Sequence, residues 1–231
     1  MMINSFKNFI ELALNKNQMG KPSPSEFNHA VAESQLKNFS EMFADLRKMN
    51  YRKSRFQDTP NYGNEAEYIK QAQEHYIKEQ EGVVITNGKA DLLNLIPDFY
   101  LFNSAFTDKA EVTKEDVRVF NTLKRNPKLQ PTTCSPICTY NDGELKVFPL
   151  LTTVDVTYFR EPKMPKWTYR IINGKESFDQ SQPDYQDLDI HPVMYHKLFI
   201  DTLGLLGLNI RDEFASQYVA QMKQEEMIAS Q

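Results

Sequence analysis

Three aspartates, Asp184, Asp187 and Asp189, form the arrangement in this sequence that is best suited to metal chemistry. Carboxylates this close together can hold a divalent cation, which can activate water for hydrolysis. However, they match neither the spacing of an EF-hand nor the lysine spacing of nuclease sites. Acids also suit the N-terminal end of a helix. We therefore favour a solvated loop before a helix, and a metal-dependent hydrolase stays an alternative that requires an ion bound here.

The histidines and cysteines do not form a recognisable metal or nucleophile motif. His191 and His196 are five residues apart, so they fall on different faces of a helix, unlike the pair in H-E-x-x-H. Cys134 and Cys138 are spaced C-x-x-x-C without a second pair of ligands. Phosphate-binding glycine loops and the G-x-S-x-G elbow are missing as well. The sequence thus predicts a protein that is not an enzyme and that uses no cofactor or metal.

A basic segment with two interleaved aromatics covers residues 47–56. Such a segment can bind the phosphates of nucleic acid or an acidic neighbouring protein. It can equally be the solvated C-terminal end of a helix, where cations suit the dipole. The cations that would contact DNA or an acidic partner are Arg47, Lys48, Arg52, Lys53 and Arg55.

A proline-bearing aromatic arm covers residues 159–170 and contains the only tryptophan. Prolines stiffen a segment and so lower the entropy cost of docking. Trp, Tyr and Arg dominate the energetics of protein interfaces. We expect a contact between subunits here, and a loop folded over its own core is the alternative. The candidate residues are Phe159, Arg160, Pro162, Pro165, Trp167, Tyr169 and Arg170.

The composition and charge of the chain argue against two further classes, free nucleic-acid binders and membrane-spanning proteins. The chain has 231 residues, of which 40% are hydrophobic, and a formal net charge of −4. This charge argues against a free nucleic-acid binder, which is usually basic. The most apolar stretch, residues 198–208, is too short and too interrupted to span a bilayer. Together with the absence of a signal-peptide pattern, this predicts a soluble protein made in the cytoplasm.

The spacing of apolar residues predicts that most elements of the chain are helices. Helices are predicted over 5–14, 23–48, 65–81, 114–124, 191–204 and 211–228. The second begins at Ser23-Pro24-Ser25-Glu26, which is a capping box. The third has a thin apolar face with Tyr68 and Tyr76, which is typical of a surface helix or of one that meets a neighbouring subunit.

The strand signals are fewer. Asp142-Gly143 and Asn173-Gly174 are typical of hairpin turns, and residues 154–160 alternate like a strand. We therefore predict an α+β fold, mainly a helical bundle with a small antiparallel β insertion. The predicted regions are 1–90 (helical), 91–180 (the β-containing insertion with the arm) and 181–231 (helices that complete the bundle).

Several segments, in this order, resemble the small head-to-tail connector (neck ring) proteins of crAss-like phages and related tailed phages of Bacteroidetes bacteria. The first is Ile3 to Phe27, with N-K-N-Q-M-G and S-P-S-E-F-N. The second is Val112 to Pro131. The third is Thr157 to Gln217, with the arm Y-F-R-E-P-K-M-P-K-W and the closing G-L-N-I-R-D.

The resemblance implies a structural virion protein without catalytic residues. It would form a ring, commonly a dodecamer, between portal and tail, and would surround the DNA channel. Its partners would be other copies of itself, the portal protein, the adjacent neck or tail rings and the double-stranded genome, with no membrane. The fold implied is that of phage head–tail adaptors. The runner-up function is a nucleic-acid-binding accessory protein that uses residues 47–55.

Overall fold

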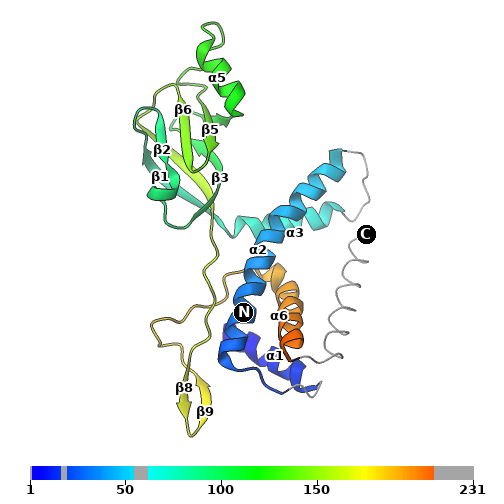
Figure 1. The fold of residues 1–231 in the computed structure, drawn as a ribbon. Helices are drawn as coiled ribbons and strands as arrows, with labels where there is room; N and C mark the ends of the chain where they lie inside the picture. The colour runs from blue at the N-terminus through cyan, green and yellow to red at the C-terminus, as the bar shows by residue number, and fades with distance from the viewer. Residues whose placement is uncertain (1, 17–19, 55–61, 211–231) are drawn as a thin grey trace. The chain divides into compact units, whose positions relative to one another are not determined.

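The computed structural model describes residues 2–16, 20–54 and 62–210 (Figure 1). The chain divides into two compact units. Met1–His75 and Pro162–Gln231 form the first, which we call the helical unit, and Tyr76–Glu161 form the second, the sheet unit. The sheet unit is thus an insertion into the helical one. These boundaries differ from those predicted at 90 and 180, because strands before residue 90 belong to the sheet unit and the segment after 161 belongs to the helical unit.

The predicted fold class, a mainly helical bundle with a small antiparallel β insertion, is wrong. Seven strands form one curled sheet that resembles a half-barrel, and the helices within the described residues make up only 39% of the chain. One cause is the region 65–81, which was predicted as a single helix. Its helix ends at Glu74, and the chain continues from Ile77 as a strand in which residues 78–82 are all exposed. The strands Lys89–Asp91, Phe99–Phe106 and Glu111–Lys114, for which the sequence analysis predicted no strand, supply the rest.

The helical unit contains four helices, three of which share one apolar core. They are α1 (Ile3–Lys16), α2 (Pro24–Ser54), α3 (Tyr62–Glu74) and α6 (Tyr195–Ile210). Helix α6 packs on both α1 and α2. Buried side chains from α1, α2 and α6 meet in this core, among them Phe6, Ile10, Phe27, Val31, Leu198 and Leu206. Their burial supplies the main stabilisation of this unit.

The capping box predicted at Ser23 sets the start of α2. Glu26 Oε2 accepts a hydrogen bond from the N–H of Ser23, and the N–H of Glu26 donates back to Ser23 Oγ, which confirms the capping box. His191 caps the 3-10 turn Pro192–Met194 that precedes α6. The break predicted at Gly204 is wrong, because α6 continues to Ile210. The helix predicted over 211–228 lies outside the described residues.

A two-stranded hairpin completes the helical unit. Strands β8 (Tyr169–Ile172) and β9 (Lys175–Phe178) pair in antiparallel register. Asn173 and Gly174 both have positive φ, of 51° and 72°, which confirms the predicted turn. A lone hairpin is only marginally stable, so this one depends on contacts at its base.

The sheet unit contains strands β1 to β7 in the order β1-β7-β3-β4-β5-β6-β2. Their bounds are Ile77–Val84, Lys89–Asp91, Phe99–Phe106, Glu111–Lys114, Ile137–Asn141, Glu144–Phe148 and Thr153–Arg160. A short helix, α4 (Leu92–Leu95), follows β2. The edge strands β1 and β2 are neighbours in the chain, joined by a turn in which the N–H of Lys89 donates to Thr86 O. The sheet therefore curls so that one continuous stretch supplies both of its edges.

Helix α5 (Val117–Arg125) connects the one parallel strand pair of the described residues, β4 and β5. Asp116 caps it and Phe120 is its buried residue; the helix predicted over 114–124 thus forms but begins at Val117, because Lys114 belongs to β4. The Asp142-Gly143 turn joins β5 to β6, also as predicted. At Gly143, φ is +81° and a Cβ would lie 2.5 Å from Leu93 Cδ1, so this turn requires glycine.

Candidate functional sites

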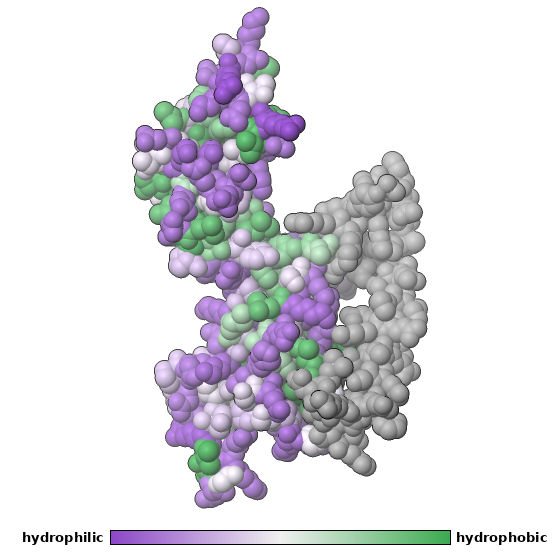
Figure 2. Space-filling model, in the orientation of Figure 1, coloured by the Kyte–Doolittle hydropathy of each residue, from purple (hydrophilic) through white to green (hydrophobic). Residues whose placement is uncertain are grey.

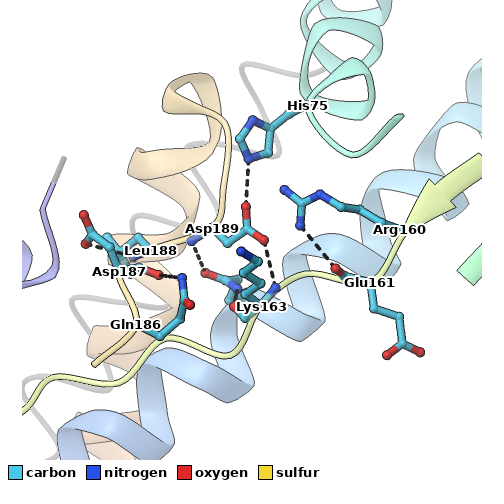
Figure 3. Close-up of polar contacts among 9 residues, drawn as sticks. His75, Arg160, Glu161, Lys163, Gln186, Asp187, Leu188 and Asp189 are labelled. Atoms are coloured by element: carbon cyan, nitrogen blue, oxygen red, sulfur yellow. Dashed lines mark hydrogen bonds and ion pairs between the residues drawn. The ribbon is translucent and has the colours of Figure 1, made fainter. Parts of the chain in front are cut away.

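A buried aspartate, Asp189, joins distant segments of the helical unit (Figure 3). Its Oδ2 accepts a hydrogen bond from the backbone N–H of Lys163 (2.8 Å), and its Oδ1 lies 3.0 Å from His75 Nε2. Gln35 of α2 completes the cluster: its Oε1 accepts from the N–H of Asp189, and its Nε2 donates to the Lys163 carbonyl. We call these four residues the Asp189 cluster. It fixes backbone positions and leaves no carboxylate oxygen without a partner.

The other two aspartates of the sequence pattern have separate partners. Asp187 Oδ1 accepts from the backbone N–H groups of Ile3 and Leu188, at 2.6 and 2.9 Å. Asp184 forms an exposed ion pair with Lys166, which lowers the pKa of its carboxyl. Within the described residues, no group of three or more His, Cys, Asp or Glu side chains could hold a metal ion. Asp184, Asp187 and Asp189 thus bind three different sets of partners.

The aromatic arm folds over its own unit. Trp167 is only 3% exposed, and its indole Nε1 donates to Asn4 Oδ1 at 3.0 Å. The Asn28 side chain bonds both the N–H and the carbonyl of Trp167, at 2.8 and 2.9 Å, and Lys7 Nζ lies 4.2 Å from the indole ring centroid. Pro162 and Pro165 are buried as well. The alternative reading, a loop folded over its own core, describes Trp167 and these prolines.

The remaining arm residues divide between the two units. Phe159 is buried in β7 of the sheet unit, where the Arg160 guanidinium lies 5.4 Å from the ring centroid of Tyr76, itself 2% exposed. Tyr169 stacks on Trp167 with a centroid distance of 5.5 Å but stays partly exposed. Tyr68, on α3, is exposed. Among these interface candidates, Tyr68 and Tyr169 offer apolar surface to another molecule.

Arg170 anchors the hairpin base through a bidentate ion pair with Asp179. Its Nε lies 2.7 Å from Oδ2 and its Nη2 3.1 Å from Oδ1. Arg170, together with hydrogen bonds from Ser181, holds the pKa of Asp179 far below its usual range. Thr168 adds a hydrogen bond from its hydroxyl to the Asp179 carbonyl. Arg170 therefore has a structural role at the hairpin base, and its part in a subunit contact stays a prediction.

A second carboxylate cluster lies in the sheet unit. Asp98 Oδ2 is 2.5 Å from Lys78 Nζ, and the Tyr158 hydroxyl donates to Asp98 Oδ1 at 2.8 Å. Burial and this hydrogen bond raise the pKa of Tyr158 to about 12, so the phenol stays protonated. The three side chains tie β1 and β7 to the turn before β3. Like the Asp189 cluster, they join segments and expose no nucleophile.

Two elements of the helical unit expose large apolar side chains. Phe9 and Leu12, three residues apart on α1, are 53% and 55% exposed, and Met2, just before the helix, is 46% exposed. The hairpin exposes Ile171 (72%) and Ile172 (53%). We call the first set the α1 stripe and the second the hairpin isoleucines.

The basic segment 47–55 cannot be placed as a site. Arg47, Lys48, Arg52 and Lys53 belong to α2, but their side chains are outside the described residues, as is Arg55 altogether. Sequence reasoning overlooked a different basic surface, on α5 and the loop after it. The available signal was the absence of Asp and Glu from Val117 to Asn141, a stretch that contains Arg118, Lys124, Arg125 and Lys128.

These four residues, which we call the α5 cations, are exposed. Strongly hydrophilic side chains gather over this end of the sheet unit in Figure 2. None of the described helices is both long and apolar enough to cross a membrane. Neither the comparison with protein-family models nor that with curated proteins finds a match to this chain.

Proposed function

We propose that this chain is a structural subunit of a phage neck, where it forms a ring between portal and tail around the DNA channel. The exposed apolar surface of the helical unit is the observation that carries the proposal. Buried interface cores consist of such large apolar side chains, whereas isolated exposed ones need no explanation. In the helical unit two elements each contribute more than one of them, as the α1 stripe and the hairpin isoleucines, while Leu36, Tyr68, Met164 and Val193 are exposed singly.

A closed ring requires two different, mutually complementary faces on each subunit. The α1 stripe is a helix surface, and the hairpin is an extended element whose strands each have an unpaired edge. Surfaces of such different shape suit a head-to-tail contact between neighbouring copies better than a two-fold contact. The occupant of each surface in this proposal is another copy of the same chain.

The burial of Trp167 within its own unit is compatible with this ring contact. Because Trp167, Tyr169 and Phe178 stack at the base of the hairpin, they stiffen it before any partner arrives. A pre-ordered hairpin loses less entropy on docking. The arm would therefore support the contact, and the isoleucines beyond it would make the contact. The similarity to neck ring proteins in the sequence supports the same location in the virion.

The experiment is mass spectrometry of purified particles of the phage that encodes the chain, followed by electron microscopy of the neck. We expect the chain in every particle at a copy number consistent with a ring. Its absence from purified virions would overturn the proposal. The oligomeric state of the isolated chain is not decisive, because such subunits assemble on a template supplied by the portal.

A further inference from the structure

The α5 cations lie in a stretch of the chain that contains no acid after the helix cap Asp116. Arg118 is in the first turn of α5, Lys124 and Arg125 are in its last turn, and Lys128 follows in the loop. From Val117 to Asn141 the chain has no Asp or Glu, although its overall formal charge is −4. In the described part of the chain, none of the four cations forms an ion pair.

Local structure explains only part of this charge. Cations in the last turn of a helix interact favourably with its dipole, which accounts for Lys124 and Arg125. Lys124 also lies 5.6 Å from the Phe148 ring centroid. Arg118, however, is in the first turn, where the dipole disfavours a cation, and Lys128 is beyond the helix. These two residues point to a partner outside the chain.

The spacing of the cations suits a phosphate backbone. At about 1.5 Å per residue, α5 is roughly 13 Å long, and phosphates follow one another about every 3.4 Å of duplex axis on each strand. The cations therefore extend over a length that matches several phosphates. An acidic protein surface would need acids in matching positions, whereas a duplex offers negative charge at every register. The acids nearest in sequence, Glu115 and Asp116, precede the helix, and Asp116 accepts a hydrogen bond from the backbone N–H of Arg118.

We propose that the α5 cations bind the phosphate backbone of double-stranded DNA, without reading its sequence. This inference names the surface of the proposed ring subunit that meets the duplex, and it rests on that function for the source of the DNA. A single subunit binds weakly through so few contacts. A ring of subunits multiplies them, because every further contact is intramolecular.

The test is fluorescence anisotropy of the full chain with a labelled duplex of about 30 base pairs, titrated at several salt concentrations from about 20 mM upward. Four phosphate contacts predict a slope of log K against log salt of about −3 to −4, or a loss of about a hundredfold between 50 and 200 mM. The variant R118Q/K124Q/R125Q/K128Q should lose this binding. The milder R118Q/K128Q should reduce the slope by about 2.

Two further variants make the assay specific. K109Q/K175Q removes the same charge as R118Q/K128Q from two other exposed sites, and we expect it to bind like the wild type. R47Q/K48Q/R52Q/K53Q removes four cations of α2. If this variant loses binding while the α5 variant keeps it, the inference is overturned. Circular dichroism shows whether each variant retains the fold.

The remaining outcomes also decide the question. A wild-type chain that does not bind the duplex even at the lowest salt overturns the inference. So does an α5 variant that binds DNA normally but no longer binds an acidic protein of the neck, which would identify a protein partner. Failure of the ring proposal is separate, because it is read from the virion composition and not from DNA binding.

Discussion

The carboxylate of Asp189 bonds both the backbone of Lys163 and the imidazole of His75. His75 is the last residue before the chain enters the sheet unit, and Lys163 is the second after it returns. One buried side chain therefore holds both connections where they leave the helical unit. Gln35 of α2 fixes the same point through two more hydrogen bonds.

Substituting Asp189 with Asn should lower the free energy of unfolding by about 1–3 kcal/mol. The asparagine amide would place a donor where the carboxylate accepts from the Lys163 N–H, so a buried hydrogen bond would be lost. Urea unfolding followed by circular dichroism measures the loss. The control is Asp184→Asn, whose exposed ion pair with Lys166 should contribute little. Equal effects of the two variants would contradict the role assigned to Asp189.

Trp167→Ala should cost about 3–5 kcal/mol in the free energy of unfolding of the isolated chain, because it leaves a cavity in the core. If Trp167 acted in a subunit contact instead, the isolated chain would keep its stability and only assembly would suffer. Thermal unfolding of the monomer separates the two cases. Tyr68→Ala, at an exposed position of α3, is the matched aromatic control and should leave the melting temperature nearly unchanged.

Changing both hairpin isoleucines to serine should leave the stability of the isolated chain unchanged and impair its assembly. Since Ile171 and Ile172 are exposed, the I171S/I172S variant should unfold like the wild type. It should, however, fail to enter particles when it replaces the wild-type chain during infection. Incorporation measured by mass spectrometry, against Val193→Ser as an exposed apolar control, checks this. Normal incorporation of the double variant would remove the hairpin from the ring contact.

The Arg170–Asp179 pair predicts a dependence of stability on acid. Because the pKa of Asp179 is lower in the folded than in the unfolded chain, its contribution is complete above the unfolded value of about 4 and is lost as the pH falls below it. The stability difference between wild type and Asp179→Asn should thus be constant from neutral pH down to about 5 and should shrink below about 4. A difference that grows in acid would contradict the assignment.

The two cysteines should react very differently. Burial raises the pKa of Cys138 to about 12, while Cys134 is exposed. At pH 8, iodoacetamide should modify Cys134 within minutes and Cys138 only after unfolding, because the thiolate is the reactive form. Mass spectrometry counts the adducts, and Cys134→Ser should give a chain that is unreactive until denaturant is added.

Much of the local structure could be predicted from single residues. The capping box at Ser23, the Asp142-Gly143 and Asn173-Gly174 turns and the strand ending at Arg160 all follow from short-range chemistry. The break at Gly204 was predicted on the same grounds and is wrong, because helix packing against α1 and α2 outweighs the cost of glycine in α6.

The fold class required information that a local pattern does not contain. Strand β1 pairs with β7, whose register partners lie far along the chain, as in Ile77 with Phe159. Nothing within residues 77–84 indicates that partner, and their charges favour a helix in isolation. Likewise Asp189 belongs to an acidic run by sequence, but its bonds to Gln35 and His75 come from tertiary packing. The α5 cations, in contrast, were visible as a stretch without acids.

The two edges of the curled sheet affect how closely many copies of the chain can be packed without aggregating. Open strand edges invite addition of a strand from another molecule, which leads to aggregation. Here one edge, β2, has three residues, and the other, β1, has a bulge after Gln80 and carries Glu79 and Glu81. Short, bulged and charged edges resist such addition. Many copies can therefore be concentrated in a small volume without their sheets fusing.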